Sequence, residues 1–304
     1  MFKNKKVFAL LVVTLSLIIT IFAMVPINKN YKVDPWMSKV SDSKLITEMS
    51  IPGTHDSGAT HSFFDVAGKC QDLSIKSQLK IGVRFFDIRL QQVNNKLNVV
   101  HSFVDQKTKF ENVLEDMAEF VTKYPSEFLI VSIKEDAESK NSIRQFDDLL
   151  KDTINVHKGI VSTSRSLPRT LKDARGKIYF ISRYADSTFG IKAYDGWKDD
   201  DSFTLNTLYV QDNYKIDTVE EKISDIEATM EYLKTSKNRL VLNFTSCYLT
   251  TGFPPTYAVP PAKQINPWLM NKLNETKESK DTLGVIVADF ITKELAESIY
   301  MRNY

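Results

Sequence analysis

The chain has 304 residues, of which 42% are hydrophobic and 26% are charged, and its formal net charge is +2. This composition is ordinary for a globular protein and leaves room for one large α/β domain or two smaller ones. A net charge near zero gives no electrostatic argument for a nucleic-acid partner, so none is expected.

The N-terminal segment has the pattern of an export signal. Lys3, Lys5 and Lys6 precede an uncharged apolar run over residues 7–25. Because positive charge stays inside, the rest of the chain should emerge on the outer side of the cytoplasmic membrane. The run is about long enough to cross a bilayer, and no clean small-residue cleavage site follows it. Residues 1–28 are therefore interpreted as a cleaved signal peptide or an uncleaved anchor, and the protein as secreted or anchored outside.

The rest of the chain divides into a connector and one large domain. Residues 29–43 are predicted to be the connector, with a short helix at Pro35-Trp36 that packs onto the domain. Residues 44–304 form the domain itself. It contains apolar runs of strand length that are rich in Ile, Val and Leu and are mostly bracketed by turn residues. These eight runs cover residues 45–51, 81–88, 97–100, 128–133, 177–181, 207–210, 240–244 and 283–288.

Helical patterns fill most intervals between these runs. Apolar residues recur at helical spacing over residues 110–124, 142–154, 217–234, 262–273 and 292–301. The strand-like runs are continuous rather than alternating, as in parallel strands buried on both faces. Strands alternating with helices predict an irregular (β/α)8 TIM-like barrel, with a doubly wound open sheet as the alternative.

One interval is too short for a helix. Between the second and third runs, Asn94-Asn95-Lys96 reads as a turn. A hairpin centred on Asn95 would place Arg89 opposite His101. We therefore expect the barrel to lack one helix between its second and third strands.

The octet Ile-Pro-Gly-Thr-His-Asp-Ser-Gly, residues 51–58, presents His55 and Asp56 on a tight turn at the end of the first run. Histidine is the side chain best suited to move protons near neutral pH. An ordinary polar turn is the alternative reading, so the octet needs partners elsewhere in the chain.

Those partners are found at the ends of the other runs, most of which finish with an ionisable residue. In a barrel these ends gather at the C-terminal face, where such folds place their sites. Such a polar face suits an anionic substrate rich in hydroxyl groups. Besides His55 and Asp56, the residues concerned are Asp87, Arg89, His101, Lys134, Glu135, Asp136, Arg183, Asp212 and Asp289.

Several segments together resemble the bacterial phosphatidylinositol-specific phospholipase C family. The resemblance covers about residues 45 to 295, essentially the whole domain. The matching segments are the octet at 51–58, Val-Arg-Phe-Phe-Asp-Ile-Arg at 83–89, His101, Ile-Val-Ser-Ile-Lys at 130–134, Asp-Ala-Arg-Gly-Lys-Ile at 173–178, Val-Gln-Asp-Asn-Tyr-Lys at 210–215 and Asn-Phe-Thr-Ser at 243–246.

The resemblance implies a catalytic barrel and a metal-independent lyase that cleaves phosphatidylinositol to diacylglycerol and inositol 1,2-cyclic phosphate. By the same resemblance, His55 is the general base on the inositol 2-hydroxyl and Asp289 supports it. His101 is the general acid, with Asp56 as its carboxylate. Arg89 binds the phosphate oxygens. The adjacent residues His55 and Asp56 would thus belong to two different pairs.

Inositol hydroxyls would be held by residues that follow later strands. Asp136 stands where the family often has a glutamate, one methylene longer, which leaves its contact with the ring open. The residues implied to bind the ring are Lys134, Asp136, Arg183, Asp212 and Tyr214.

Metal dependence can be argued at one position. Calcium-dependent relatives hold the metal with acidic residues at these strand ends, whereas here Arg89 follows two residues after Asp87, on the same face of a strand. A guanidinium there would repel a divalent cation, so no metal and no cofactor are expected. The alternatives are a metal-dependent glycerophosphodiester or sphingomyelin phosphodiesterase on the same barrel, and a non-catalytic phosphoinositide-binding module.

The expected partner is phosphatidylinositol in a membrane, or a glycosyl-phosphatidylinositol anchor, contacted peripherally by a monomer. Two loops offer apolar groups for the membrane: Phe63 and Phe64 in one, and Phe253 and Tyr257 in the other. Packing of these loops on each other is the equal alternative.

Other residues are given weaker roles. Cys70 and Cys247 lie in these two loops, without metal-ligand spacing, and could form a disulfide or stay free thiols. His61 and His157 are expected at the surface. The tryptophans Trp36, Trp197 and Trp268 are expected to pack or lie at the surface rather than in a site.

Overall fold

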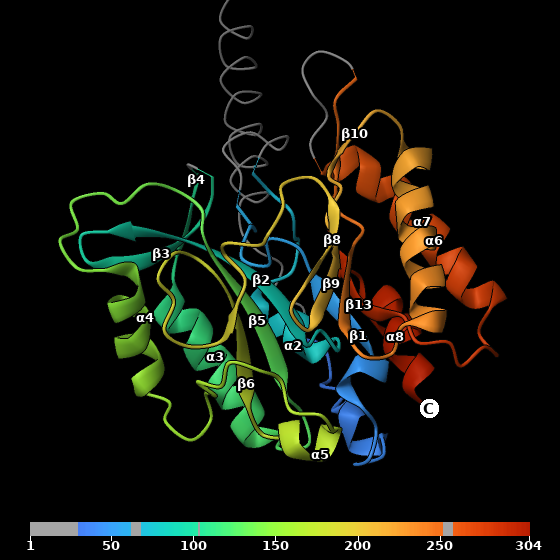
Figure 1. The fold of residues 1–304 in the computed structure, drawn as a ribbon, viewed down its shortest axis with the longest axis horizontal. Helices are drawn as coiled ribbons and strands as arrows, with labels where there is room; N and C mark the ends of the chain where they lie inside the picture. The colour runs from blue at the N-terminus through green and yellow to red at the C-terminus, as the bar shows by residue number, and fades with distance from the viewer. Residues whose placement is uncertain (1–29, 62–67, 103, 252–257) are drawn as a thin grey trace, which may run out of the picture.

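The computed structural model describes residues 30–61, 68–102, 104–251 and 258–304. Its centre is a curled, mainly parallel sheet with helices outside it (Figure 1). Across the sheet, the strands are β7 (Ile191–Lys192), β6 (Ile178–Arg183), β5 (Leu129–Glu135), β2 (Phe85–Val93), β1 (Ser50–Thr54), β13 (Gly284–Ala288), β11 (Leu240–Phe244), β9 (Leu208–Gln211) and β8 (Ser202–Leu205).

The predicted TIM-like barrel is confirmed, with two irregularities. Each predicted strand run overlaps an observed strand. The third run, however, is β3 (Lys96–His101), which pairs antiparallel with β2 and is not one of the parallel barrel strands. Within the described ranges the sheet ends at β7 and β8 instead of closing. The short strand β7, which is parallel to β6, takes the place of a full-length eighth barrel strand.

The hairpin that replaces a helix is confirmed, but its register differs from the prediction. Asn94 and Asn95 have φ of 51° and 58° and form a two-residue turn. The register pairs Leu90 with Val99, so Arg89 lies level with Val100 and not with His101. The prediction was wrong by one residue because it counted Lys96 in the turn, whereas Lys96 pairs with Val93. Strand β4 (Val104–Lys109) extends the hairpin.

The five predicted helices form, with ends shifted by a few residues. Figure 1 shows α3 and α4 on one side of the sheet and α6 and α7 on the other. Two short helices, α2 and α5, were not predicted. The helices are α2 (Ile75–Lys80), α3 (Phe110–Lys123), α4 (Phe146–Asn155), α5 (Leu171–Ala174), α6 (Val219–Thr235), α7 (Val259–Glu275) and α8 (Lys293–Tyr300), with 3-10 turns at Trp36–Lys39, Ile46–Glu48 and Met301–Asn303. In the part of the chain that the structure describes, no helix is long and apolar enough to cross a membrane.

Both faces of the barrel strands are buried, which accounts for their continuous apolar sequences. In β5, Leu129 and Val131 join the core under the helices, whereas Ile130 between them faces the interior core with Phe85 and Leu242. A small separate sheet of β10 (Lys215–Ile216) and β12 (Tyr248–Leu249) lies beside α6 and α7.

A buried ion pair joins the beginnings of β2 and β5, at the end of the barrel away from the polar strand ends. Arg84 and Glu127 are 2.8 Å apart, and both side chains are fully buried. Arg84 also donates to the carbonyls of Leu79, Val83 and Asp34. The guanidinium thus ties the connector to the base of the barrel.

Removing one partner of this pair leaves a buried charge without its counter-ion. We expect Glu127→Gln to lower the free energy of unfolding by about 3 kcal/mol. Glu231→Gln, which removes an exposed partner of Lys234, should change it by less than about 1 kcal/mol. Urea unfolding followed by circular dichroism measures both, and equal shifts for the two variants would contradict this assignment.

Candidate active site

A cleft of about 490 Å³ opens at the C-terminal ends of the barrel strands. All the predicted catalytic and substrate-binding residues line it except Asp56, which is fully buried beside it. Those lining residues are His55, Arg89, His101, Lys134, Asp136, Arg183, Asp212, Tyr214 and Asp289. The strand ends therefore converge as the barrel prediction requires.

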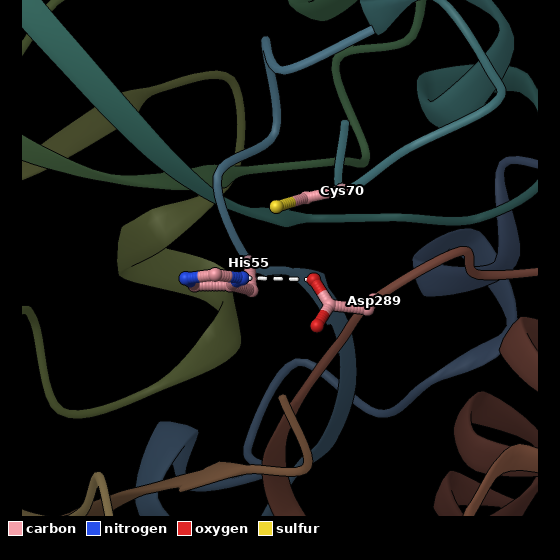
Figure 2. Close-up of side chains that lie close together, drawn as sticks. All are labelled: His55, Cys70 and Asp289. Carbon is pink, nitrogen blue, oxygen red and sulfur yellow. Dashed lines mark hydrogen bonds and ion pairs between the residues drawn. The ribbon is translucent and has the colours of Figure 1, made fainter. Parts of the chain in front are cut away.

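His55 and Asp289 are brought together by the pairing of their strands. Thr54 at the end of β1 is level with Ala288 at the end of β13, so the next residue of each strand faces its counterpart. His55 Nδ1 lies 2.8 Å from Asp289 Oδ1 (Figure 2). The amide of Gln71 donates to the carbonyls of His55 and Ala288, which holds the two strand ends together.

The contact of His55 with Arg89 defines the tautomer of the imidazole. Arg89 Nη2 lies 2.7 Å from His55 Nε2. Because a guanidinium can only donate, Nε2 accepts this bond and the ring proton sits on Nδ1, facing Asp289. Burial lowers the pKa of His55, but the Asp289 carboxylate outweighs burial, and the pKa is raised above 6.5.

A second histidine lies near a second carboxylate. His101 Nδ1 is 3.5 Å from Asp56 Oδ2, which is longer than a normal N–H···O hydrogen bond. Asp56 is fully buried, and neither carboxylate oxygen has a hydrogen-bond partner among the described residues. Burial raises the pKa of Asp56. The adjacent residues His55 and Asp56 thus lie in two different histidine–aspartate pairs.

Arg89 is surrounded by carboxylates. Its Nε lies 3.3 Å from Asp87 Oδ2 and 3.5 Å from Asp56 Oδ2, and its Nη1 lies 3.8 Å from Asp136 Oδ1. Asp87 also contacts Arg183 at 3.2 Å, so it bridges two guanidinium groups. Burial alone would raise the pKa of Asp87, but Arg89 and Arg183 hold it well below its usual range.

Asp87 was not among the predicted site residues. It is fully buried and does not line the cleft. The sequence placed Asp87 at a strand end, two residues before Arg89, but indicated no role for it. It could not reveal the contact with Arg183, which comes from another strand.

Asp136 is engaged on both sides by the protein itself. Its Oδ1 accepts from Lys134 Nζ at 2.6 Å, and its Oδ2 accepts from the Ser102 backbone N–H at 2.8 Å. These bonds orient the Asp136 side chain toward Lys134 and Ser102.

Trp197 packs against Phe203 and Phe244 as expected, but it also lines the cleft, so the expectation that it lies outside the site was wrong. Its ring lies under the guanidinium of Arg183 at 3.7 Å, and its Nε1–H donates to Asp212 Oδ2 at 3.2 Å. Trp197 lies in the loop between β7 and β8 rather than at a strand end, which is why the strand-end argument missed it. Trp36, in contrast, is fully buried as expected.

Tyr214 is fixed at the other rim of the cleft. Its hydroxyl donates to Asp199 Oδ1 at 2.5 Å, and Lys215 Nζ donates to Asp199 Oδ2 at 2.7 Å. Burial and the bond to Asp199 raise the pKa of Tyr214 to about 12. The phenol therefore stays protonated at neutral pH.

Both cysteines line the cleft as buried free thiols, so the disulfide left open by the sequence does not form in this structure. Cys70 Sγ lies 3.8 Å from His101 Nδ1. Figure 2 shows that the same sulfur also lies close to the His55–Asp289 pair. The sequence placed Cys70 in a loop beside the expected cleft but did not indicate its contact with His101.

The residue directly after each of three candidate catalytic residues has a strained backbone conformation. Asp56, Ser102 and Phe290 have positive φ of 38°, 52° and 47°, and each directly follows His55, His101 or Asp289. Non-glycine residues adopt this region at a cost, often at functional sites. The chain turns sharply at each position, directly after it has presented the preceding side chain.

The remaining expectations lie elsewhere. Phe63, Phe64, Phe253 and Tyr257 are outside the described residues. His61 and His157 are half-buried rather than at the surface, and neither lines the cleft. His157 Nε2 lies 3.4 Å from Glu115 on α3, whereas the His61 backbone N–H donates to Gln106.

The chain is similar to known proteins over most of its length. Residues 46–184 match the model of the phosphatidylinositol-specific phospholipase C X domain. The 1-phosphatidylinositol phosphodiesterase of Staphylococcus aureus strain Newman is 30% identical over 84% of this chain and 87% of its own length. The Listeria monocytogenes enzyme of the same name is 29% identical over 91% of this chain and 87% of its own length.

Solved structures show the same fold. A Staphylococcus aureus phosphatidylinositol-specific phospholipase C superposes with a TM-score of 0.76 at 28% identity, over 89% of this chain and 98% of that one. The Listeria monocytogenes enzyme superposes with a TM-score of 0.73 at 27% identity, over 88% of this chain and 97% of that one. The chain therefore belongs to the phosphatidylinositol-specific phospholipase C family.

Proposed function

We propose that this chain cleaves phosphatidylinositol to diacylglycerol and inositol 1,2-cyclic phosphate without a metal. The observation that carries the proposal is the arrangement of His55, Arg89 and His101 around one cleft, with Asp289 and Asp56 behind the two imidazoles. A base, an acid and a phosphate-binding cation are what an intramolecular displacement at phosphorus requires.

In this mechanism His55 is the general base. Its Nε2 carries a lone pair toward the cleft because its proton is on Nδ1. When a phosphate takes the guanidinium of Arg89, Nε2 is free to accept the proton of the inositol 2-hydroxyl. Asp289 fixes the tautomer and stabilises the imidazolium that forms. Because the hydroxyl adjoins the phosphate, positioning supplies much of the rate.

His101 is the general acid in the same step. The oxygen–phosphorus bond to diacylglycerol breaks as the 2-hydroxyl oxygen attacks, and the imidazolium of His101 gives the leaving oxygen its proton. Asp56, 3.5 Å from Nδ1, supports that imidazolium. Slow hydrolysis of the cyclic ester can follow with the two histidines in exchanged roles.

The inositol ring is assigned to the part of the cleft beyond Arg89. Lys134, Arg183, Asp212 and Tyr214 offer donors and acceptors there, with Trp197 as an apolar wall. We assign Asp136 the secondary task of orienting Lys134, because both of its oxygens already accept hydrogen bonds from the protein.

Arg89 also bears on the metal-dependent alternative. Its guanidinium lies within 4.0 Å of three carboxylates that could otherwise serve a divalent cation. A hard cation at this position would have to displace or adjoin a fixed positive charge. The non-catalytic alternative lacks support as well, because both histidines retain a nearby carboxylate.

We propose further that the chain acts at a membrane surface after export. The Staphylococcus aureus relative binds membranes. Residues 1–28 are assigned to a signal peptide or an anchor, 29–43 to the connector and 44–304 to the catalytic barrel. Phe63, Phe64, Phe253 and Tyr257 remain the proposed membrane contacts, and a lipid or a glycosyl-phosphatidylinositol anchor is the proposed target of a monomer.

The reaction itself is tested by product analysis. In EDTA, the chain should convert phosphatidylinositol vesicles to inositol 1,2-cyclic phosphate, followed by ³¹P NMR, and leave phosphatidylcholine intact. His55→Ala and His101→Ala should each lower the rate by about 10²–10⁴-fold. His157→Ala, outside the cleft, should change it little. Absence of the cyclic product, or its appearance only with calcium, would refute the proposal.

The pKa of His55 gives a pH dependence with a definite sign. A base must be unprotonated, so a raised pKa places the acidic limb of kcat/KM above pH 6.5. Asp289→Asn removes the charge that raises this pKa but leaves burial, which lowers it. The limb should therefore move to lower pH while the plateau falls, by roughly 10²–10⁴-fold. A limb that stays in place would show that His55 is not the titrating base.

The membrane contacts are tested by adding charge to them. Phe64→Glu and Phe253→Glu should slow cleavage of phosphatidylinositol in vesicles but leave hydrolysis of soluble inositol 1,2-cyclic phosphate unchanged, because only the first substrate requires insertion into a bilayer. Ile143→Glu is the matched control, since Ile143 is exposed and does not line the cleft. Equal losses on both substrates would show that the loops support the fold instead.

A further inference from the structure

Cys70 is fixed between the two histidine–aspartate pairs by its backbone. Its N–H donates to the carbonyl of Ala59, after β1, and its carbonyl accepts from the N–H of Phe290, after β13. These bonds hold the thiol 3.8 Å from His101 Nδ1. None of the catalytic roles proposed above uses it.

Asp56 completes a set of three donors. Its two buried oxygens lack hydrogen-bond partners among the described residues, although Oδ2 lies 3.5 Å from His101 Nδ1. One ligand atom from each of Asp56, Cys70 and His101 lies within 4.8 Å of the others. A tetrahedral zinc ion with bonds of about 2.0 Å to oxygen and nitrogen and about 2.3 Å to sulfur separates its ligand atoms by about 3.3–3.5 Å. The nitrogen–oxygen separation is 3.5 Å and the nitrogen–sulfur separation is 3.8 Å, so small side-chain shifts would bring the three atoms to one ion.

We propose that Asp56, Cys70 and His101 form an inhibitory binding site for a thiophilic divalent cation of the zinc and cadmium class. The inhibitory effect rests on the function proposed above, because it requires His101 to be the general acid. Binding itself does not. Water would supply the fourth ligand at the cleft.

The donor set selects the cation. Thiolate and imidazole favour Zn²⁺ and Cd²⁺, whereas Ca²⁺ and Mg²⁺ prefer shells of oxygen. The cation displaces the thiol proton to solvent, so its two charges are balanced by the thiolate and the Asp56 carboxylate. The bound site is thus formally neutral. Arg89 Nε lies 3.5 Å from Asp56 Oδ2. The charge of Arg89 is, however, compensated by Asp87 and Asp136. The guanidinium therefore disfavours a hard cation at these carboxylates more than a soft cation bound through thiolate and imidazole.

A second donor group, His55, Cys70 and Asp289, shares the same thiol. In that group Nδ1 and the carboxylate are already joined by a 2.8 Å hydrogen bond (Figure 2), which a cation would have to break. In the Asp56 group the imidazole and the carboxylate are 3.5 Å apart without a hydrogen bond, and only the weak thiol contact of Cys70 with His101 would be replaced. The cation is therefore assigned to Asp56, Cys70 and His101.

Inhibition follows from the atom that the cation occupies. A metal on Nδ1 of His101 takes the place of the proton that makes the ring an imidazolium, and it engages the Asp56 carboxylate. The proton that remains, on Nε2, is held more tightly than a proton of the imidazolium, so the ring becomes a poorer general acid for the leaving oxygen. A saturating cation should lower the rate of cleavage at least about tenfold, since a general acid contributes roughly 10²–10⁴-fold.

Binding is tested separately from activity. The full chain, freed of metal by EDTA and dialysis, is titrated with Cd²⁺, and the ultraviolet charge-transfer band of the cadmium–thiolate bond is recorded. The original chain and Cys247→Ser should gain the band, saturating at about one cation per chain. Cys70→Ser and Cys70→Ala should not gain it. A band that is absent from the original chain, or that survives both Cys70 variants, overturns the site.

Inhibition is then measured with Zn²⁺ on phosphatidylinositol vesicles, each variant being compared with its own rate in EDTA. The original chain and Cys247→Ser should lose activity and recover it with EDTA, whereas the Cys70 variants and Ca²⁺ controls should not lose it. If Cd²⁺ binds at Cys70 and Zn²⁺ leaves the rate unchanged, the inhibitory role is overturned. If Cd²⁺ binds at Cys70 but no cleavage occurs in EDTA, the proposed function fails and the metal site stands.

Discussion

The buried charge of Arg89 is the constraint on which the rest of the cleft depends. Three carboxylates and one imidazole are grouped around its guanidinium. Without this cation, Asp56, Asp87 and Asp136 would be like charges in a buried space, and their protonation states would change. The arginine thus sets the ionisation of its neighbours, in addition to its proposed role in binding the phosphate. Any account of one residue in this group has to include the others.

The barrel scaffold brings this group together through strand register. Parallel pairing of β1 with β13 makes His55 level with Asp289, and pairing of β2 with β5 makes Arg89 level with Lys134. Asp136 follows two residues after Lys134 and completes the contact with Arg89. The β2–β3 hairpin carries His101 back to the same cleft from an antiparallel strand. Segments distant in sequence thus meet because neighbouring strands end together.

Much of the fold was predictable, because the strand runs are continuous and the helices carry regular apolar stripes. The site residues were predictable where they follow strands and match the family segments. Trp197 and Cys70 lie in loops whose course depends on packing, so no periodicity located them. The hairpin register was missed by one residue because a two-residue turn and a three-residue turn share the same asparagines. Asp87 was visible as a strand-end residue, but its second arginine required the tertiary structure.

The left-handed backbone after His55, His101 and Asp289 creates a trade-off between the stability of the fold and the precise placement of these side chains. Asp56, Ser102 and Phe290 each hold a conformation that disfavours side chains, at a cost of about 1–3 kcal/mol apiece. Substitution of Ser102 or Phe290 by glycine would remove this conformational cost and raise the stability of the fold. The same changes would make the orientation of the preceding imidazole or carboxylate side chain less well defined. Thermostable descendants of this chain should therefore keep the strain at these turns and find their stability elsewhere in the barrel.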